Sequence, residues 1–393
     1  MMDTNERFIF LLVVIAIGGM IALTIGYMEH VRRSEMRRLE SLLERAKELG
    51  GFDIIGAYMN PGDVGDIEGL LDRMKENGVN LIIVFVNPRG QVAYYPSKYY
   101  KFIGGRGEDP LARIIDMAHE RGIKVWAWFD FMGYKELLER HPDWAAVYPD
   151  GKTTLERPYY EGSAARYPMN PLHPEVKEFW KNALLELVTR YDIDGVNFED
   201  DYGYCYGGEN YSYDDMNRKA FLRFALEHNV TDVVWPDDVV PGGRYHDLWI
   251  KFKCHTIAEL TKELYQAIKS VKPHVVVSIA VAVHPWQLEC GVDWRLLAKE
   301  GCIDALTFML YSDDTDWVAR SAKMVSDEFK RLNSTVKPII IIGWELRDDP
   351  PVKWLEQAVA VLELGYKELI LFDASIVDSI PNCWSVFKEL RRV

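Results

Sequence analysis

Short apolar runs alternate with segments of helical spacing along the chain from residue 52 onward. Eight of these runs are rich in β-branched and aromatic residues and nearly continuous: residues 53–59, 80–86, 123–131, 193–200, 274–283, 303–311, 337–346 and 368–375. Runs without polar alternation are typical of parallel strands that are covered on both faces of a sheet. The segments between them repeat apolar residues every three or four positions, which predicts amphipathic helices.

Eight strands with intervening helices predict an α/β protein with a (β/α)8 TIM-barrel fold over residues 52–393. A doubly wound open sheet is the alternative, but no GxGxxG or P-loop sequence follows the first strand. In a barrel of this kind the chemistry is expected at the carboxyl ends of the strands.

The N-terminus has a different pattern. Residues 8–28 form a stretch without a charged side chain that is long enough for one transmembrane helix. No small-x-small cleavage site follows it. We therefore expect residues 1–28 to be a tail with a retained single-pass anchor in the lipid bilayer. Residues 29–51 place leucines at helical spacing opposite a charged face, which predicts a stalk helix or linker that ends at Gly50–Gly51.

Sequence features disagree on which side of the membrane the barrel lies. Arg7 precedes the apolar stretch, whereas six basic residues follow it, namely Arg32, Arg33, Arg37, Arg38, Arg45 and Lys47. The positive-inside rule then favours a cytoplasmic barrel. Three N-x-[ST] sequons and the family resemblance below favour the opposite side, and an extracytoplasmic barrel is our working hypothesis.

Composition narrows the range of partners. The net charge of −14 disfavours a nucleic-acid partner, whose phosphates would be repelled. The five cysteines lack CxxC or Cys/His metal spacing and their number is odd, so we expect them to be mostly free and structural. No cofactor is indicated.

Polar residues gather where the predicted strands end. The most conspicuous group is the triplet Glu199, Asp200 and Asp201, which ends the fourth strand. Strand alternation directs Asn197, Glu199 and, without a bulge, Asp201 toward the barrel axis. Asp194, just before Gly195, is interpreted as a turn or capping residue.

Crowded carboxylates suit glycosidic bond hydrolysis, which needs one protonated and one ionised carboxyl group. Mutual repulsion and burial raise one pKa, so that one group keeps its proton near neutral pH. Glu345, at the end of the seventh strand, is the candidate for the opposite side of the bond. The triplet also offers oxygen ligands for Ca2+ or Mg2+, but no DxDxDG or HExxH motif supports a metal site.

Aromatic and polar residues at the same strand ends are candidates for substrate binding, because sugar rings pack on aromatic faces and their hydroxyls need polar partners. The tyrosine-rich segment 202–213 is expected to form an exposed binding loop. The substrate-binding candidates are Asp130, Trp128, Asn197, Tyr202, His284, Trp286, Tyr311, Trp344 and Asp373.

Several stretches together give the chain a family resemblance. They include "DPLARIIDMAHERGIKVWAWFDF" (109–131), "HPDWAAVYPDGK" (141–152), "MNPLHPEVKEF" (169–179) and "RYDIDGVNFEDDYGY" (190–204). In these it resembles the glycoside-hydrolase-like TIM-barrel family of bacteria and archaea, and more distantly the poly-N-acetylglucosamine-cleaving barrels. The resemblance implies a TIM barrel that hydrolyses a glycan, with its acidic centre after the fourth strand.

Two positions depart from the family pattern. The family usually has F-D-D-Y where this chain has F-E-D-D-Y, so either Glu199 replaces the first Asp or Asp200 and Asp201 match the pair. Asp130 stands where the family often has Asn. We therefore expect a membrane-anchored glycosidase acting on a polysaccharide or oligosaccharide. The alternatives are a metal-dependent polysaccharide deacetylase or other hydrolase, and a carbohydrate-binding barrel without catalysis.

Overall fold

A closed barrel of eight parallel strands forms the centre of the computed structural model, which describes residues 33–160, 162, 165–200, 202–206 and 209–392. The barrel strands are β1 (Ile54–Met59), β2 (Leu81–Phe85), β5 (Lys124–Phe129), β6 (Gly195–Phe198), β9 (Val276–Ala282), β10 (Ala305–Met309), β11 (Lys337–Ile342) and β12 (Glu368–Leu371). Each lies within one of the eight apolar runs, so the predicted strands are confirmed.

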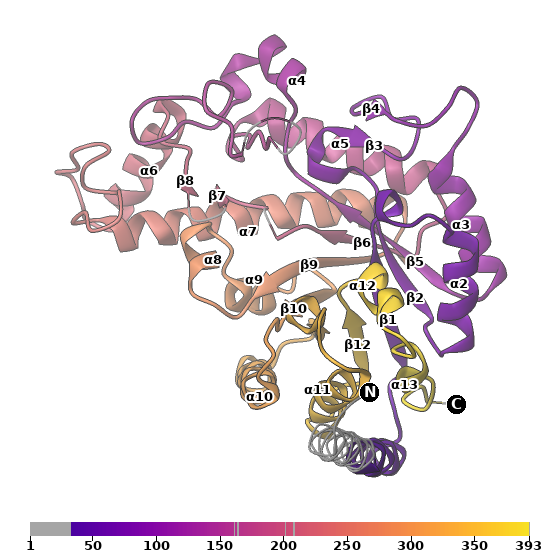
Figure 1. Ribbon diagram of the computed structural model, residues 1–393. Helices are drawn as coiled ribbons and strands as arrows, with labels where there is room; N and C mark the ends of the chain where they lie inside the picture. The colour runs from indigo at the N-terminus through magenta and orange to yellow at the C-terminus, as the bar shows by residue number, and fades with distance from the viewer. Residues whose placement is uncertain (1–32, 161, 163–164, 201, 207–208, 393) are drawn as a thin grey trace, which may run out of the picture.

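Closure of the sheet decides between the two candidate folds. β1 pairs with β2 on one side and with β12 on the other, both in parallel, so no strand of the barrel has a free edge. The prediction of a TIM barrel is confirmed, and the open doubly wound sheet is excluded (Figure 1). The mouth of the barrel, where the strands end, is the face at which function is expected.

Helices surround the barrel and follow the strands in alternation (Figure 1). They are α2 (Ile67–Glu76), α3 (Pro110–Glu120), α4 (Lys135–Arg140), α5 (Pro174–Arg190), α6 (Asp215–Glu227), α7 (His246–Val271), α8 (Trp286–Glu289), α9 (Trp294–Glu300), α10 (Thr315–Leu332), α11 (Pro351–Glu363), α12 (Ala374–Ser379) and α13 (Ser385–Lys388). Carboxylates cap several of them: Asp109, for example, accepts a hydrogen bond from the Ala112 amide at the start of α3.

Two apolar layers hold the barrel together. Side chains that point inward from alternate strand positions, such as Ile83, Trp126 and Ile341, fill the barrel interior. Side chains that point outward, such as Val196 and Phe198, pack beneath the helices. Strand alternation therefore has the predicted phase in β6, with Asn197 on the inner side.

The predicted stalk segment forms a helix over residues 33–48, but it is not a free stalk. Its apolar face packs on the outer layer, where Ala46 is completely buried and Leu39, Leu42, Leu43 and Leu49 are partly buried. From residue 33 onward, none of the described helices is long and apolar enough to cross a bilayer. The uncharged stretch 8–28 lies outside the described residues.

An excursion after β6 extends to one side of the barrel and contains the hairpin β7 (Cys205–Tyr206) and β8 (Glu209–Asn210), followed by α6 (Figure 1). It has its own apolar cluster around Phe221 and Trp249. A disulfide bond joins Cys205 to Cys290, so the prediction that the cysteines are mostly free holds for the other three. Cys254, Cys302 and Cys383 are free and buried.

Candidate active site

The floor of the mouth is a hydrogen-bonded polar network inside the barrel. The Tyr58 hydroxyl donates to Asn197 Oδ1 over 2.7 Å, and Asn197 Nδ2 donates to Ser278 Oγ and Thr307 Oγ1 over 2.8 and 3.1 Å. Asn197 is completely buried, so its amide is used to cross-link strands. This residue, predicted to bind substrate, lies beneath the mouth as part of its support.

Asp130 lies at the end of β5 and is completely buried. Its main-chain amide and carbonyl both bind the side chain of Asn87, at 3.0 and 2.8 Å. Its carboxylate accepts hydrogen bonds from the main-chain amides of Met132, at 2.7 Å, and Arg89. The loop after β2 reaches this position because Gly90 has a φ of 59° and a Cβ there would lie 1.8 Å from the Met132 carbonyl oxygen.

Arg166 supplies a positive charge to this buried carboxylate. Its Nη1 atom lies 3.2 Å from Asp130 Oδ2, and the arginine side chain is itself 17% exposed. Main-chain hydrogen bonds of 3.1 and 2.8 Å with Tyr159 hold Arg166 in the long loop between β5 and α5. Burial nevertheless raises the pKa of Asp130 to about 6, against the lowering effect of Arg166.

Glu199 and Asp200 follow β6 and are partly buried at the mouth. Burial raises the pKa of Asp200, while a hydrogen bond with the Glu199 side chain and the charge of Arg166 lower it. A hydrogen bond between two carboxyl groups requires a shared proton, so one of the pair is neutral when it forms. Asp200 also raises the pKa of Asp130, which links the ends of β5 and β6 electrostatically.

Tyr58, which is buried, and Tyr311, which is partly buried, mark the extent of this acidic site. Burial raises the pKa of Tyr311, and the negative charges of Asp200, Glu199 and Asp373 raise it further. Burial likewise raises the pKa of Tyr58, with further contributions from Glu199 and Asp200. Carboxylates that follow β6 and β12 therefore both act on Tyr311 through their charge.

Asp201 lies outside the described residues, so the choice between the two alignments of the triplet stays open. In the part of the chain that the structure does describe, no group of three or more His, Cys, Asp or Glu side chains is arranged to hold a metal ion.

Glu345 is placed differently from the prediction. The strand predicted over 337–346 ends at Ile342, and Glu345 lies exposed on the short 3-10 helix η5 (Trp344–Leu346). The chain turns at Gly343, where φ is 132° and a Cβ would lie 2.4 Å from the Phe372 carbonyl oxygen. A strand that ends four residues early leaves Glu345 on the rim of the mouth.

Aromatic rings at the ends of several strands form one connected group at the mouth. Trp128 stacks on Phe85 at 3.8 Å between centroids and meets Tyr58 edge-on at 5.0 Å. Phe372 contacts Tyr58, Tyr311 and the 40% exposed Trp344, at centroid distances of 5.2 to 5.7 Å. The predicted residues Trp128, Tyr311 and Trp344 thus belong to one aromatic group.

The remaining predicted residues are divided. Asp373 follows β12 and caps α12 through the Ile376 amide at 3.0 Å. His284 is exposed in the loop after β9, and Trp286 is exposed at the start of α8. Tyr202, in contrast, is buried in the outer layer against Phe131.

The tyrosine-rich segment as a whole does not match the expected exposed binding loop. Tyr204, Tyr211 and Tyr213 are buried like Tyr202. Tyr204 and Tyr213 pack on Trp249 of α7, and Tyr211 packs on Tyr148. Tyrosine density therefore marks a second packing centre in this stretch.

Sequence patterns did not indicate Arg166 or Tyr58 as site residues. A buried aspartate at the end of a strand needs a cation nearby, so the position of Asp130 could have predicted a basic partner. It could not identify which arginine, because Arg166 lies 36 positions away from Asp130 in a loop without a motif.

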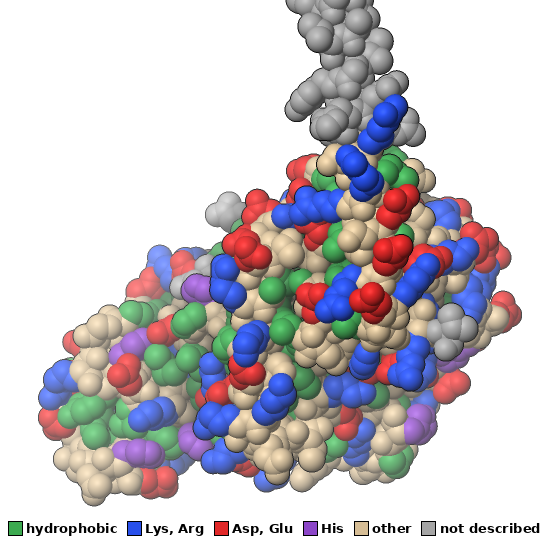
Figure 2. Space-filling model, turned by 90° about the horizontal axis from the view of Figure 1, so that it is seen from below, with side chains coloured by type: hydrophobic (Ala, Val, Ile, Leu, Met, Phe, Trp, Pro, Cys, Tyr) green, Lys and Arg blue, Asp and Glu red, His purple; other side chains and the backbone are tan. Residues whose placement is uncertain are grey.

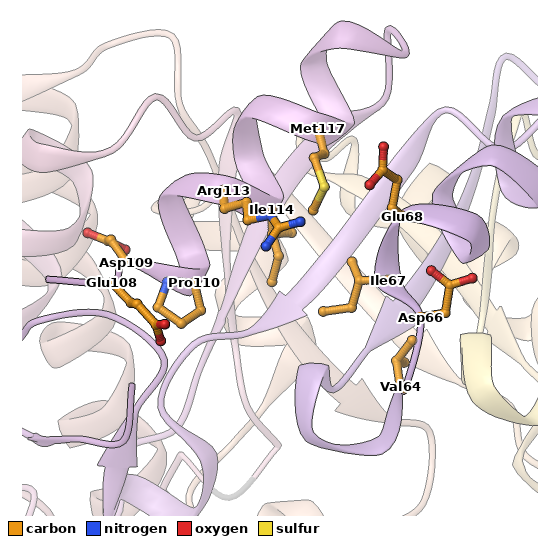
Figure 3. Close-up of a pocket in the computed structure, with 11 residues that line it drawn as sticks. Val64, Asp66, Ile67, Glu68, Glu108, Asp109, Pro110, Arg113, Ile114 and Met117 are labelled. Atoms are coloured by element: carbon orange, nitrogen blue, oxygen red, sulfur yellow. The ribbon is translucent and has the colours of Figure 1, made fainter. Parts of the chain in front are cut away.

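A cavity of about 500 Å3 on the outer wall lies apart from this site. It opens between the starts of α2 and α3, and Figure 3 shows Ile67 and Glu68 of α2 facing Arg113 and Ile114 of α3 across it. None of the predicted site residues lines it.

Comparisons with known proteins agree with this geometry. A family described as Glycosyl hydrolase-like 10 matches residues 65–352. The chain is 29% identical over 232 residues to the glycosyl hydrolase YngK of Bacillus subtilis, covering 52% of this chain and 37% of that protein. It is 33% identical over 145 residues to the glycosyl hydrolase DigH of Escherichia coli K12, covering 33% and 32%.

Among solved structures, the glycoside hydrolase domain of PgaB from Bordetella bronchiseptica superposes with a TM-score of 0.66 at 16% identity, covering 86% of this chain and 99% of that domain. A β-galactosidase from Halorubrum lacusprofundi gives 0.61 at 13% identity, covering 81% and 52%. These likenesses confirm the barrel fold. The chain spans about a third of the length of YngK and DigH.

Proposed function

Because the chain belongs to the glycosyl hydrolase-like 10 family, we propose that its barrel mouth hydrolyses the glycosidic bonds of a polysaccharide or oligosaccharide. The observation that carries this proposal is the position of two adjacent, partly buried carboxyl groups, Glu199 and Asp200, directly after β6 at the mouth, where burial raises the pKa of Asp200. Such a pair keeps one proton donor and one ionised group at the same place.

The proton donor is one member of this pair. It protonates the leaving oxygen as the bond from that oxygen to the anomeric carbon breaks. A water molecule supplies the new oxygen of the anomeric carbon and gives its proton to an ionised carboxylate. The charge of Arg166 lowers the pKa of Asp200, and the charge of Asp200 raises the pKa of Asp130.

The ionised carboxylate on the far side of the bond has two candidates. Glu345 on the exposed rim is our candidate for nucleophile or base, and another member of the Glu199–Asp201 cluster is the alternative. If the sugar carries an N-acetyl group, its amide oxygen can replace the protein nucleophile.

Substrate contacts are proposed for the rings and polar side chains at the mouth. Trp128, Tyr311, Trp344 and Trp286 provide faces for sugar rings. The indole nitrogen of Trp128 is buried without a hydrogen-bond partner among the described residues, and a sugar hydroxyl would satisfy it. His284 and Asp373 are candidates for further hydroxyl contacts.

The direct test incubates the full-length protein in detergent with a panel of polysaccharides and measures new reducing ends and product masses. Wild-type protein should release oligosaccharides, and Asp200→Asn should not. Asp192→Asn, at an exposed position before β6, is the matched control and should retain full activity.

The same assay separates the alternatives. Acetate release that is lost on chelation would identify a metal-dependent deacetylase instead of a glycosidase. Glycan binding without any product, in wild-type protein, would identify a binding barrel.

For localisation we propose a single-pass protein with an extracytoplasmic barrel. The Cys205–Cys290 disulfide supports this side, because disulfides persist in oxidising compartments. The basic residues after the apolar stretch are weak evidence for a cytoplasmic barrel, although they are numerous. Arg38, Arg45 and Lys47 form ion pairs with the barrel, so their positions have a structural explanation.

A membrane-impermeant thiol reagent applied to intact cells tests this side, with Asp348→Cys as the exposed reporter. Labelling in intact cells supports the proposal. Labelling only after lysis would place the barrel in the cytoplasm.

A further inference from the structure

The helix of residues 33–48 runs alongside α11 in the same direction. Arg38 Nε lies 2.5 Å from Glu356 Oε1, and Arg45 Nε lies 2.8 Å from Glu363 Oε1. Both ion pairs advance by seven residues along each helix, from 38 to 45 and from 356 to 363, so the two helices are parallel. Figure 1 shows this N-terminal helix beside α11.

This direction places the beginning of the helix at the mouth. α11 follows β11 and η5, so it begins at the mouth and descends to the opposite end of the barrel. At that opposite end the Leu49 carbonyl accepts a hydrogen bond of 3.2 Å from Lys367, which immediately precedes β12. Residue 33 is therefore at the level of the mouth, about 7 Å beyond Arg38 along the helix axis.

The helix is fixed to the barrel and cannot reorient as a free stalk would. Ala46 is completely buried against the outer layer, and Lys47 forms a 3.0 Å ion pair with Glu389. Together with the two arginine pairs, these contacts hold the helix against the barrel from Arg38 to Lys47. A constraint applied at residue 33 consequently acts on the whole barrel.

The uncharged stretch 8–28 ends five residues before position 33. Five residues span at most about 18 Å even when fully extended. If the stretch lies in a bilayer, as proposed, the membrane surface is within that distance of residue 33 and thus close to the mouth.

The surface at this end of the helix suits contact with a bilayer. Arg33 and Arg37 are exposed, Met36 is 51% exposed, and Figure 2 shows Lys and Arg side chains gathered around the point where the described helix begins. Basic side chains favour anionic headgroups, and apolar ones favour the interfacial layer. An apolar groove of about 540 Å3 lies beside them and is lined by Met36, Leu39, Leu43, Pro350, Pro351 and Val352.

We propose that the mouth of the barrel faces the bilayer that holds residues 8–28, and that its substrate is a glycan held at the membrane surface. This inference rests on the proposed glycosidase function for its substrate and on the proposed anchor for its geometry. Two kinds of substrate fit this proposal, because both present glycosidic bonds at the membrane surface. One is a glycan joined to a lipid, and the other is a glycan polymer that passes close to the membrane.

Orientation is measured first, without any catalysis. The full-length protein is placed in liposomes of neutral and anionic phospholipids that carry headgroup nitroxides, with a fluorescent probe at Asp348→Cys near the mouth or His274→Cys at the opposite end. Both positions are exposed, whereas the three free cysteines are buried, so the introduced thiol is the one labelled. The probe at position 348 should be quenched much more strongly than the probe at position 274, and equal or reversed quenching would overturn the proposal.

A linker variant is the matched control. A flexible Gly/Ser insertion of about 20 residues between Arg32 and Arg33, with a mean reach of roughly 25 Å, keeps both anchor and barrel but removes the fixed distance. The difference in quenching between the two probe positions should then largely disappear. An unchanged difference would refute the orienting role of the helix.

Activity in the same liposomes tests the substrate. An oligosaccharide on a lipid anchor should be cleaved about 100-fold faster than the same oligosaccharide in solution, because the anchor raises its effective concentration at the mouth. The linker variant should lose this ratio. Equal rates would refute the membrane-held substrate, whereas a long soluble polymer cleaved as fast as the anchored glycan would identify a passing polymer. Inactivity toward all of them would count against the proposed function and would leave the quenching result intact.

Discussion

Both ends of the barrel carry aspartates next to strands, but the partners of these side chains differ between the two ends. At the end opposite the mouth, Asp194 Oδ2 accepts a 2.8 Å hydrogen bond from the Val125 amide and lies 3.0 Å from His119 Nε2. Asp304 Oδ2 does the same with the Val277 amide, at 2.8 Å, and with Lys269 Nζ, at 2.6 Å. Each carboxylate there joins a neighbouring strand and has its own basic partner.

At the mouth, Asp130 and Asp200 both interact with Arg166, and burial raises the pKa of both. Asp200 also shares a hydrogen bond with another carboxyl group, that of Glu199. Crowding of like charges costs stability, and a protein keeps it where the chemistry uses it. The comparison separates carboxylates that stabilise the barrel from those suited to proton transfer.

The largest expected effect is on catalysis at the mouth. Asp200→Asn keeps the size of the side chain but removes an ionisable group, so kcat should fall by about 100- to 10,000-fold. The free energy of unfolding should be unchanged or slightly higher, because burial already disfavours the charged form. Reducing-end assays and urea unfolding measure the two quantities. Full activity in both Asp200→Asn and Glu199→Gln would contradict the assignment.

Removal of the shared cation should have the next largest effect. Arg166 lowers the pKa of both Asp130 and Asp200, so Arg166→Gln should raise both values. The limb of the pH profile of kcat/KM that Asp200 governs should then move to higher pH. The protein should also lose up to about 3 kcal/mol of stability near neutral pH, because Asp130 must then either keep an unpaired charge in a buried position or take up a proton.

Arg157→Gln is the control for this substitution. Arg157 lies in the same loop but pairs with Asp150 and stacks over Tyr148, 3.9 Å from the ring centroid. Its loss should leave the pH profile in place. A profile that moves equally in both variants would show that Arg166 has no specific influence on Asp200.

Asp130 should give the protein a pH-dependent stability. Its pKa is about 6 in the folded state and about 3.9 in an unfolded chain. Below pH ~4 both states hold the proton, and between pH ~4 and ~6 only the unfolded state releases it. The free energy of unfolding should therefore fall through this window by up to about 3 kcal/mol and stay level above it.

Asp130→Asn should remove this decline, as urea unfolding at intervals across the window can measure. Asp348→Asn, at an exposed position, should retain it. An identical decline in wild type and Asp130→Asn would assign it to other groups.

The sequence was sufficient for the barrel because its strands are continuous apolar runs with a regular spacing. It also located Glu199 and Asp200, since strand alternation and the end of β6 decide where they lie. Gly343 could not be foreseen to end β11 early, because its positive φ depends on the close approach of Phe372 from the next strand. Arg166 and the burial of Tyr202 likewise depend on contacts between segments distant in the chain.

The smallest expected effect is at the end opposite the mouth, where activity should not change. Asp194→Ala leaves the Val125 amide and His119 without their acceptor, which should lower the free energy of unfolding by about 1–3 kcal/mol. Because β6 and its neighbours keep their register through main-chain hydrogen bonds, kcat/KM should stay unchanged. Asp304→Ala should behave in the same way, as unfolding and kinetic measurements on both variants can show. A loss of activity without a loss of stability in either variant would mean that the two ends do not divide stability from catalysis.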